Sequence, residues 1–85
     1  MISKVEKRTG LFLINVVDRR VVIHSREIES KIIVNLFSYE KMDFVVQGYI
    51  IMNSNYTMIE KKLAKGKYRV TLETLKEKKE KIVTV

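Results

Sequence analysis

Residues 31–52, KIIVNLFSYEKMDFVVQGYIIM, contain the pattern that decides the fold. Two runs rich in β-branched and aromatic residues, 31–37 and 43–52, flank the more polar stretch 38–42. Stiff branched side chains fit the pleated surface of a strand better than a helix. The segment therefore predicts two strands joined by a turn at residues 38–42, and the many Ile and Val residues elsewhere predict a β-rich domain.

Successive side chains of a strand point to opposite faces, so each predicted strand can be divided into two sets. In the first strand, one face carries Ile32, Val34 and Leu36, and the other carries Ile33, Asn35, Phe37 and Tyr39. In the second strand, the two sets are Phe44, Val46, Ile50 and Met52, and Val45, Gln47, Tyr49 and Ile51. Gly48 inside this strand predicts either a bulge or a close approach by another backbone.

Upstream, residues 11–24 form an apolar run that Asp18, Arg19 and Arg20 interrupt. A two-residue hairpin turn at this point would need residues that tolerate positive φ, and arginine is poorly suited to that. We therefore expect one long strand, bent or bulged near Asp18, instead of a hairpin. The polar residues 25–30 then form a loop.

Downstream, the period changes from that of a strand to that of a helix. Apolar residues recur at i, i+3 and i+7 in Tyr56, Ile59 and Leu63. Ser54 or Asn55 can cap the start, and Gly66 fits the position after the end. This spacing predicts a helix of about ten residues.

The last third of the chain predicts two more strands. Residues 67–75 alternate cleanly, with Tyr68, Val70 and Leu72 expected to point inward. Residues 76–80 are charged, and residues 81–85 are again strand-like. We expect residues 76–80 to be the connection of a hairpin, because a short charged helix with few apolar contacts would be marginally stable.

The expected order is therefore a long strand, two strands, a helix and two strands, in a single domain spanning residues 1–85. This is the order of an OB-like five-stranded β-barrel with one short helix. An SH3-like barrel, or an α+β sheet with one helix packed across it, would use nearly the same elements.

The stretch Gly66-Lys-Tyr-Arg-Val-Thr-Leu72 resembles the Gly-x-Tyr-x-Val-x-Leu stretch of single-stranded-DNA-binding proteins from filamentous phages. Those proteins also have an OB-type fold. The resemblance covers residues 66–72 only, and it assigns no family.

Charge indicates the class of partner. The chain has 17 Lys and Arg against 10 Asp and Glu, a net charge of +7, and residues 60–85 alone hold nine basic and four acidic residues, or +5. Such an excess attracts polyanions. No apolar run approaches the roughly 20 residues that span a bilayer, and no targeting segment is visible. We therefore expect a cytoplasmic protein that has no membrane contact.

Residue types argue against catalysis. There is no cysteine, which excludes disulfides and thiolate zinc sites, and His24 is the only histidine. The three glycines form no phosphate-binding loop, and no spacing typical of metal ligands occurs. We expect no enzyme, cofactor or metal. The least favoured alternative is a Mg²⁺-dependent nuclease built on Asp18, Glu27 or Asp43.

The predicted function is binding of single-stranded DNA or RNA with little sequence preference, by aromatic stacking beside a basic groove. The stacking and polar candidates on the second and third predicted strands are Phe37, Tyr39, Gln47 and Tyr49. Basic candidates near the strand ends are Arg19, Arg20, Arg26, Lys31 and Lys41, and Lys67 and Arg69 extend the track.

Two alternatives stay open. Register decides which face of a strand points inward, so Phe37 and Tyr49 can equally be core residues. Because both sides of residues 31–52 are apolar, an exposed strand edge also predicts a homodimer. It equally fits a protein-interaction module, such as an assembly subunit or inhibitor from a virus, plasmid or host.

Overall fold

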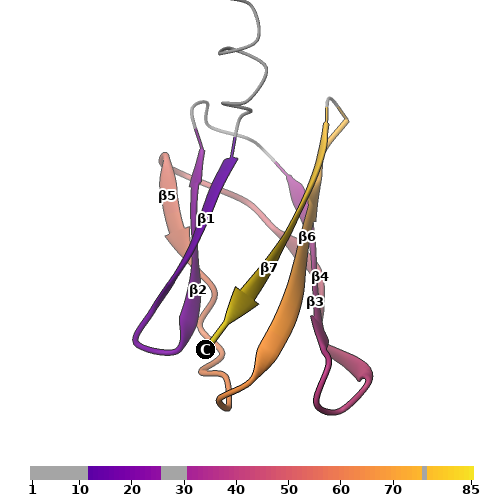
Figure 1. Cartoon of the computed structure of the whole chain (residues 1–85). Coiled ribbons are helices and arrows are strands. Elements are labelled where there is room, and N and C mark those ends of the chain that lie inside the picture. The colour runs from indigo at the N-terminus through magenta and orange to yellow at the C-terminus, as the bar shows by residue number, and fades with distance from the viewer. Residues whose placement is uncertain (1–11, 26–30, 76) are drawn as a thin grey trace, which may run out of the picture.

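The computed structural model describes residues 12–25, 31–75 and 77–85, which contain seven strands in two antiparallel sheets (Figure 1). A three-stranded sheet has the order β1 (Phe12–Val17), β2 (Arg20–Ser25) and β5 (Tyr56–Met58). A four-stranded sheet has the order β4 (Asp43–Ile50), β3 (Ile32–Ser38), β6 (Lys67–Glu73) and β7 (Lys78–Thr84). The sheets face each other, and the core lies between them.

This arrangement is a sandwich and not the expected OB-like five-stranded barrel. The two sheets are separate, and the described residues contain no helix, so the SH3-like barrel and the sheet with a packed helix are also wrong. In constant-type immunoglobulin domains, strands A, B and E share one sheet, and C, F and G share the other. Strands β1, β2 and β5 correspond to the first group and β3, β6 and β7 to the second, while β4 lies beside β3. The strand order is therefore immunoglobulin-like.

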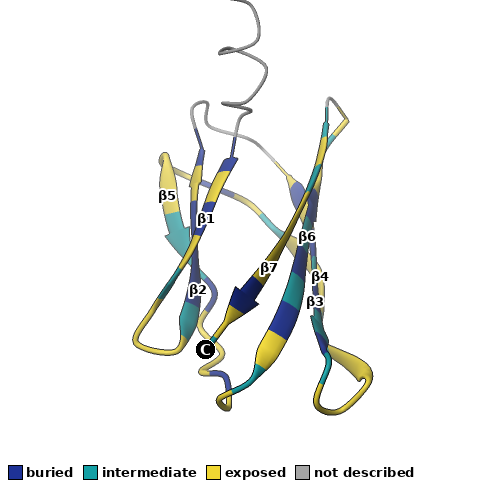
Figure 2. Ribbon diagram, in the orientation of Figure 1, coloured by how far each residue is buried: buried dark blue, intermediate teal, exposed yellow. Residues whose placement is uncertain are grey.

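Alternation places the core where the sequence of β3 and β6 predicts it (Figure 2). The buried residues of these strands are Ile32, Val34, Leu36, Tyr68, Val70 and Leu72, and they pack against Phe12, Ile14, Val21 and Ile23 of the other sheet. Burial of each such aliphatic side chain stabilises the fold by about 1.5–3 kcal/mol. Because the inner faces of these two strands are confirmed, their remaining side chains must face away from the core.

Strands β1 and β2 form a hairpin, so the expected single bent strand is wrong. Val17 pairs with Arg20, which leaves Asp18 and Arg19 as a two-residue turn with φ of 52° and 61°. Positive φ at both central residues is the type I′ geometry, which matches the twist of the flanking strands. Asp tolerates this conformation, whereas Arg adopts it at some cost.

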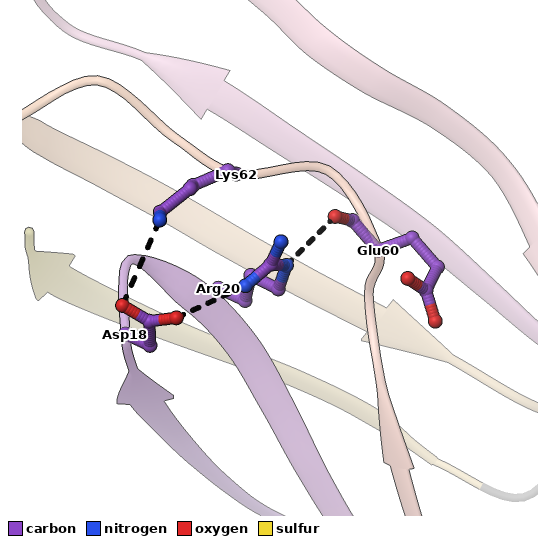
Figure 3. A network of polar contacts seen from close by, with 4 residues as sticks. All are labelled: Asp18, Arg20, Glu60 and Lys62. Atoms are coloured by element: carbon purple, nitrogen blue, oxygen red, sulfur yellow. Dashed lines mark hydrogen bonds and ion pairs between the residues drawn. The ribbon is translucent and has the colours of Figure 1, made fainter.

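Polar contacts offset that cost (Figure 3). The Asp18 carboxylate lies 3.2 Å from Nη1 of Arg20 and 3.8 Å from Nζ of Lys62. Arg20 Nε donates to the backbone oxygen of Glu60 at 3.0 Å. The backbone N–H of Leu63 donates to the backbone oxygen of Arg19 at 2.8 Å. The turn is thereby fastened to the segment that follows β5.

That segment is where the sequence predicts a helix, and the prediction is wrong. After β5, the backbone continues along β2, with the N–H of Ile59 donating to the oxygen of Val21 at 2.8 Å. Ile59 and Leu63 are both buried. A spacing of four residues puts two side chains on one face of a strand as well as on one face of a helix. The apolar pattern is therefore compatible with both structures, and pairing with β2 decides between them.

Tyr68 closes the connection between the sheets. Its ring is buried, and its hydroxyl donates a hydrogen bond to the backbone oxygen of Ala64 at 2.7 Å. Gly66 between them has a φ of 151°, which disfavours any side chain. A tyrosine near the start of strand F that bonds backward to the backbone is the tyrosine corner of immunoglobulin-like sandwiches. The stretch 66–72 that resembles the phage proteins lies at this corner and along β6.

The β3–β4 hairpin contains an irregularity that changes its faces. Phe37 pairs with Phe44, but the next residue back, Leu36, pairs with Val46, so Val45 is the extra residue of a β-bulge. Gly48, where the sequence predicts a bulge or a close approach, pairs regularly with Val34. The bulge therefore lies three residues earlier than the glycine.

Strand β7 joins the two sheets along one side of the sandwich. The predicted β6–β7 hairpin is confirmed, but β7 begins at Lys78, so residues 78–80 belong to the strand and not to the expected connection. The turn is held by the N–H of Thr74, which donates to the backbone oxygen of Glu77 at 2.9 Å. From β7, Nζ of Lys81 donates to the backbone oxygen of Ile14 in β1 at 2.8 Å. One side chain thus joins the edge strands of the two sheets.

Candidate nucleic-acid interface

The side of the four-stranded sheet that points away from the core, called the outer face below, gathers most of the predicted site residues. All four strands contribute to it: Ile33, Asn35, Phe37 and Tyr39 from β3 and its end; Phe44, Gln47 and Tyr49 from β4; Lys67, Arg69, Thr71 and Glu73 from β6; and Lys78, Glu80, Ile82 and Thr84 from β7. Because Phe37 and Tyr49 face outward, the alternative that places them in the core is wrong.

An aromatic cluster, formed by Phe37, Tyr39 and Phe44, occupies one end of the outer face. The ring of Phe37 lies 5.2 Å from that of Phe44 and 5.4 Å from that of Tyr39, and both contacts are edge-to-face. Such contacts fix ring orientation and are worth about 0.5–1.5 kcal/mol each. Phe44 remains 41% exposed. The cluster is therefore rigid and still offers aromatic surface to a ligand.

Two cations from β6 lie over this cluster. Cζ of Arg69 is 5.0 Å from the centre of the Phe37 ring and 6.0 Å from that of Tyr39, and Nζ of Lys67 is 5.8 Å from Tyr39. The adjacency follows from register, since Phe37 pairs directly with Arg69. Cation–π contacts at exposed sites are worth only about 0.5–1 kcal/mol. These positive charges are consequently held beside the rings and can still turn toward a phosphate.

A second aromatic site lies at the opposite end of the outer face. Tyr49 is 61% exposed and pairs with Ile33, and Nζ of Lys31 lies 4.6 Å from its ring centre. Along β3, Ile33 is four residues from Phe37, which corresponds to about 13 Å at about 3.3 Å per residue. The two aromatic sites are therefore too far apart to hold one base together, and each would hold its own.

Polar side chains separate the two aromatic sites. Gln47, Asn35 and Thr71 are aligned across β4, β3 and β6 in one row of the sheet. Two amides and a hydroxyl can donate and accept hydrogen bonds with any base or sugar. The outer face therefore alternates aromatic, polar and aromatic rows, with its cations at the two ends.

Three of the predicted basic residues lie away from the outer face, and a fourth lies outside the described residues. Arg19 and Arg20 lie in the β1–β2 hairpin, in the other sheet, and Arg20 is engaged with Asp18 and Glu60. Lys41 is exposed in the turn between β3 and β4, beyond Tyr39. Arg26 lies outside the described residues, as does Glu27. Arg19 and Arg20 do lie at strand ends, as expected, but these ends belong to the other sheet and not to the one that carries the aromatic residues.

Phe44 is the outer-face residue that sequence reasoning missed. Without the bulge, residues 44 and 49 lie five positions apart and point to opposite faces. The extra residue at Val45 turns Phe44 to the same face as Tyr49. Valine carries no bulge signature, so the sequence offers no local signal. The only hint in the sequence is an aromatic residue that lies an odd number of positions from Tyr49.

Candidate catalytic groups are scattered. His24 is exposed on β2, with its ring 5.0 Å from that of Tyr56. Asp18 and Asp43 lie in different sheets. In residues 12–25, 31–75 and 77–85, no three His, Asp or Glu residues come together as metal ligands would. The same residues contain no helix suited to crossing a membrane.

The sequence matches no protein-family model and no curated protein.

Proposed function

We propose that this protein binds single-stranded nucleic acid on the outer face of the β4–β3–β6–β7 sheet, as an intracellular binding protein and not an enzyme. One observation carries the proposal: a single exposed sheet face holds two aromatic sites about 13 Å apart, each with a cation over its ring. Single strands are bound in this way, by stacking on aromatic residues while basic side chains hold the backbone.

Open antiparallel sheets suit this task. A flat sheet face lets splayed bases stack on aromatic residues of neighbouring strands, as in the four-stranded sheets of RNA-recognition motifs. Here Phe44 and Tyr49 come from β4, and Phe37 comes from β3. The protein's charge of +7 adds a sequence-independent attraction. Because stacking tolerates every base, we expect little sequence preference.

The decisive experiment titrates labelled single-stranded DNA, single-stranded RNA and duplex DNA at low and moderate salt. We expect both single strands to bind more tightly than the duplex, with affinity that falls as salt rises. Tyr fluorescence should be quenched, because the chain contains no Trp and Tyr49 is exposed. Absence of binding at low salt would overturn the proposal.

A matched pair of variants locates the site. Tyr49→Ala removes an exposed tyrosine from the outer face, and Tyr56→Ala removes one that is 48% exposed on the other sheet. Loss of one stacked base costs about 1–3 kcal/mol, which is roughly a 5- to 150-fold loss of affinity. We expect that loss for Tyr49→Ala only. Equal effects of the two substitutions would show that the outer face is not the site.

A protein-interaction role through a strand edge is the second candidate, favoured by the unpaired edge of β4. Recovery of a defined protein partner, together with no affinity for any nucleic acid in the titration above, would establish it instead.

A further inference from the structure

The sandwich protects its strand edges unequally. An unpaired edge exposes backbone N–H and C=O groups to other chains, and proteins usually block it with lysines, short strands or a covering element. In the described residues, β5 has three residues, and β7 carries Lys78, Lys79 and Lys81. The β1 edge is covered where Lys81 bonds to Ile14. Only β4 remains to be considered.

Strand β4 has little of the usual protection, which is limited to the bulge near its start. It spans eight residues, it contains no lysine or proline, and within the described chain it pairs with β3 alone. Its one charge is Asp43, at its first residue. The bulge at Val45 disturbs the start of the strand, which leaves Val46–Ile50 as a regular edge. A second strand can therefore add to this edge over five residues.

Gly48, in the middle of this edge, has no role in the chain's own fold. A Cβ added at Gly48 would meet no atom within 4 Å, and no positive φ requires glycine there. Glycine inside a strand destabilises it by roughly 0.5–1 kcal/mol relative to alanine. No contact in the described residues therefore requires glycine at this position. At the centre of the edge, it presents no side chain that an added strand would have to accommodate.

We propose that the occupant of this edge is a second copy of the chain, paired antiparallel through β4 with Gly48 on the two-fold axis. In this register Val46 lies opposite Ile50 of the second copy, and Gln47 lies opposite Tyr49 of the second copy. Inner-face residues then meet inner-face residues, and outer meet outer, which the period of a strand requires. The two four-stranded sheets become one continuous sheet.

Charge favours the antiparallel direction. The one charged residue of β4 is Asp43, and Val46–Ile50 holds none. In the antiparallel register the two Asp43 side chains lie at opposite ends of the joined strands, whereas a parallel in-register pairing would set these like charges side by side.

The test is sedimentation velocity of the full chain over a range of concentrations, without nucleic acid. We expect a concentration-dependent dimer. Gln47→Lys places two ammonium groups about 7–8 Å apart across the axis, at diagonal positions of the paired strands, and should weaken the dimer at least tenfold. Thr84→Lys adds the same charge to the same sheet at the β7 edge and should leave the dimer unchanged. Circular dichroism melting should show both variants folded, since both positions are exposed.

Amide hydrogen exchange supplies a second measurement. Raising the wild-type concentration should increase the protection of residues 46–50 but not of β5, and Gln47→Lys should abolish the increase. A chain that stays monomeric, a dimer that survives Gln47→Lys, or new protection elsewhere would each overturn the inference. The dimer is measured on the wild-type chain without nucleic acid, and single-strand binding is measured by the titration and the Tyr49→Ala and Tyr56→Ala pair described above. A failed dimer and a failed nucleic-acid site are therefore distinguishable.

Discussion

The hydroxyl of Tyr68 lies 2.7 Å from the backbone oxygen of Ala64, and the bond closes a loop of four residues from inside the core. The ring itself is only 4% exposed. The bond therefore holds the start of β6 in a fixed relation to the segment that follows β5.

Tyr68→Phe should lower the free energy of unfolding by about 1 kcal/mol, because it removes one buried hydrogen bond and leaves the packing of the ring intact. For a domain of this size, that change lowers Tm by about 4–8 °C. Calorimetry or thermal circular dichroism measures the shift. Tyr49→Phe, at an exposed position of the outer face, is the control and should change Tm little. Equal shifts in the two variants would contradict a special role for the Tyr68 hydroxyl.

The β1–β2 turn allows backbone preference and charge to be separated at one position. Asp18→Ala removes both the tolerance for a φ of 52° and the contacts with Arg20 and Lys62. Asp18→Asn keeps the tolerance and removes the charge. We expect Asp18→Ala to cost about 1 kcal/mol of unfolding free energy, and Asp18→Asn to cost less than about 0.5 kcal/mol, because exposed ion pairs contribute little. Urea denaturation measures both values. The reverse ranking would mean that the ion pairs, and not φ, stabilise the turn.

The contact between Lys81 and Ile14 should contribute to stability although it is near the surface. Lys81→Met keeps the length of the side chain and removes the ammonium group that donates to the Ile14 oxygen. We expect a loss of about 1 kcal/mol, at the low end for a charged hydrogen bond because water competes at this site. Lys78→Met on the same strand is the matched control. If both variants unfold at the same urea concentration, the contact does not stabilise the sandwich.

Arg69 should make a salt-dependent contribution to nucleic-acid binding. Arg69→Met keeps the aliphatic contact with Phe37 and removes the guanidinium that lies 5.0 Å from its ring. If Arg69 contacts one phosphate, the slope of log affinity against log salt should decrease in magnitude by about 0.7. Fluorescence titrations at several salt concentrations measure the slope. Arg19→Met, in the other sheet, removes the same charge and should leave the slope nearly unchanged, whereas an equal decrease would favour diffuse attraction.

The parts of the fold that could be predicted are the segments whose apolar residues follow a spacing that only one type of secondary structure allows. Strict alternation in β3 and β6 identified both strands and their inner faces. Ile59 and Leu63 could not be assigned, because a spacing of four residues suits a helix and a strand alike. The turn at Arg19 was missed because a contact with a distant segment stabilises a conformation that arginine does not prefer.

The grouping of Phe37, Tyr49 and Arg69 was predictable for a related reason. Once Ile32, Val34 and Leu36 are buried, Phe37 must face outward, and the pairing of β3 with β4 and β6 brings Tyr49 and Arg69 to the same face. That pairing depends only on neighbouring strands, so these three residues share one face although the predicted barrel is wrong. The bulge at Val45 has no sequence signal, and this is why Phe44 was assigned to the wrong face.

The Lys81 contact also bears on how many copies can join. A molecule with two open edges adds copies at both ends and grows into a filament, whereas a two-fold pairing through a single edge uses up that edge. Lys81 bonds across to the backbone oxygen of Ile14, which ties the β1 and β7 edges to each other and occupies a backbone acceptor that a further strand would need. Association through β4 would therefore stop at two molecules, because the contact of Lys81 with β1 hinders the addition of a third.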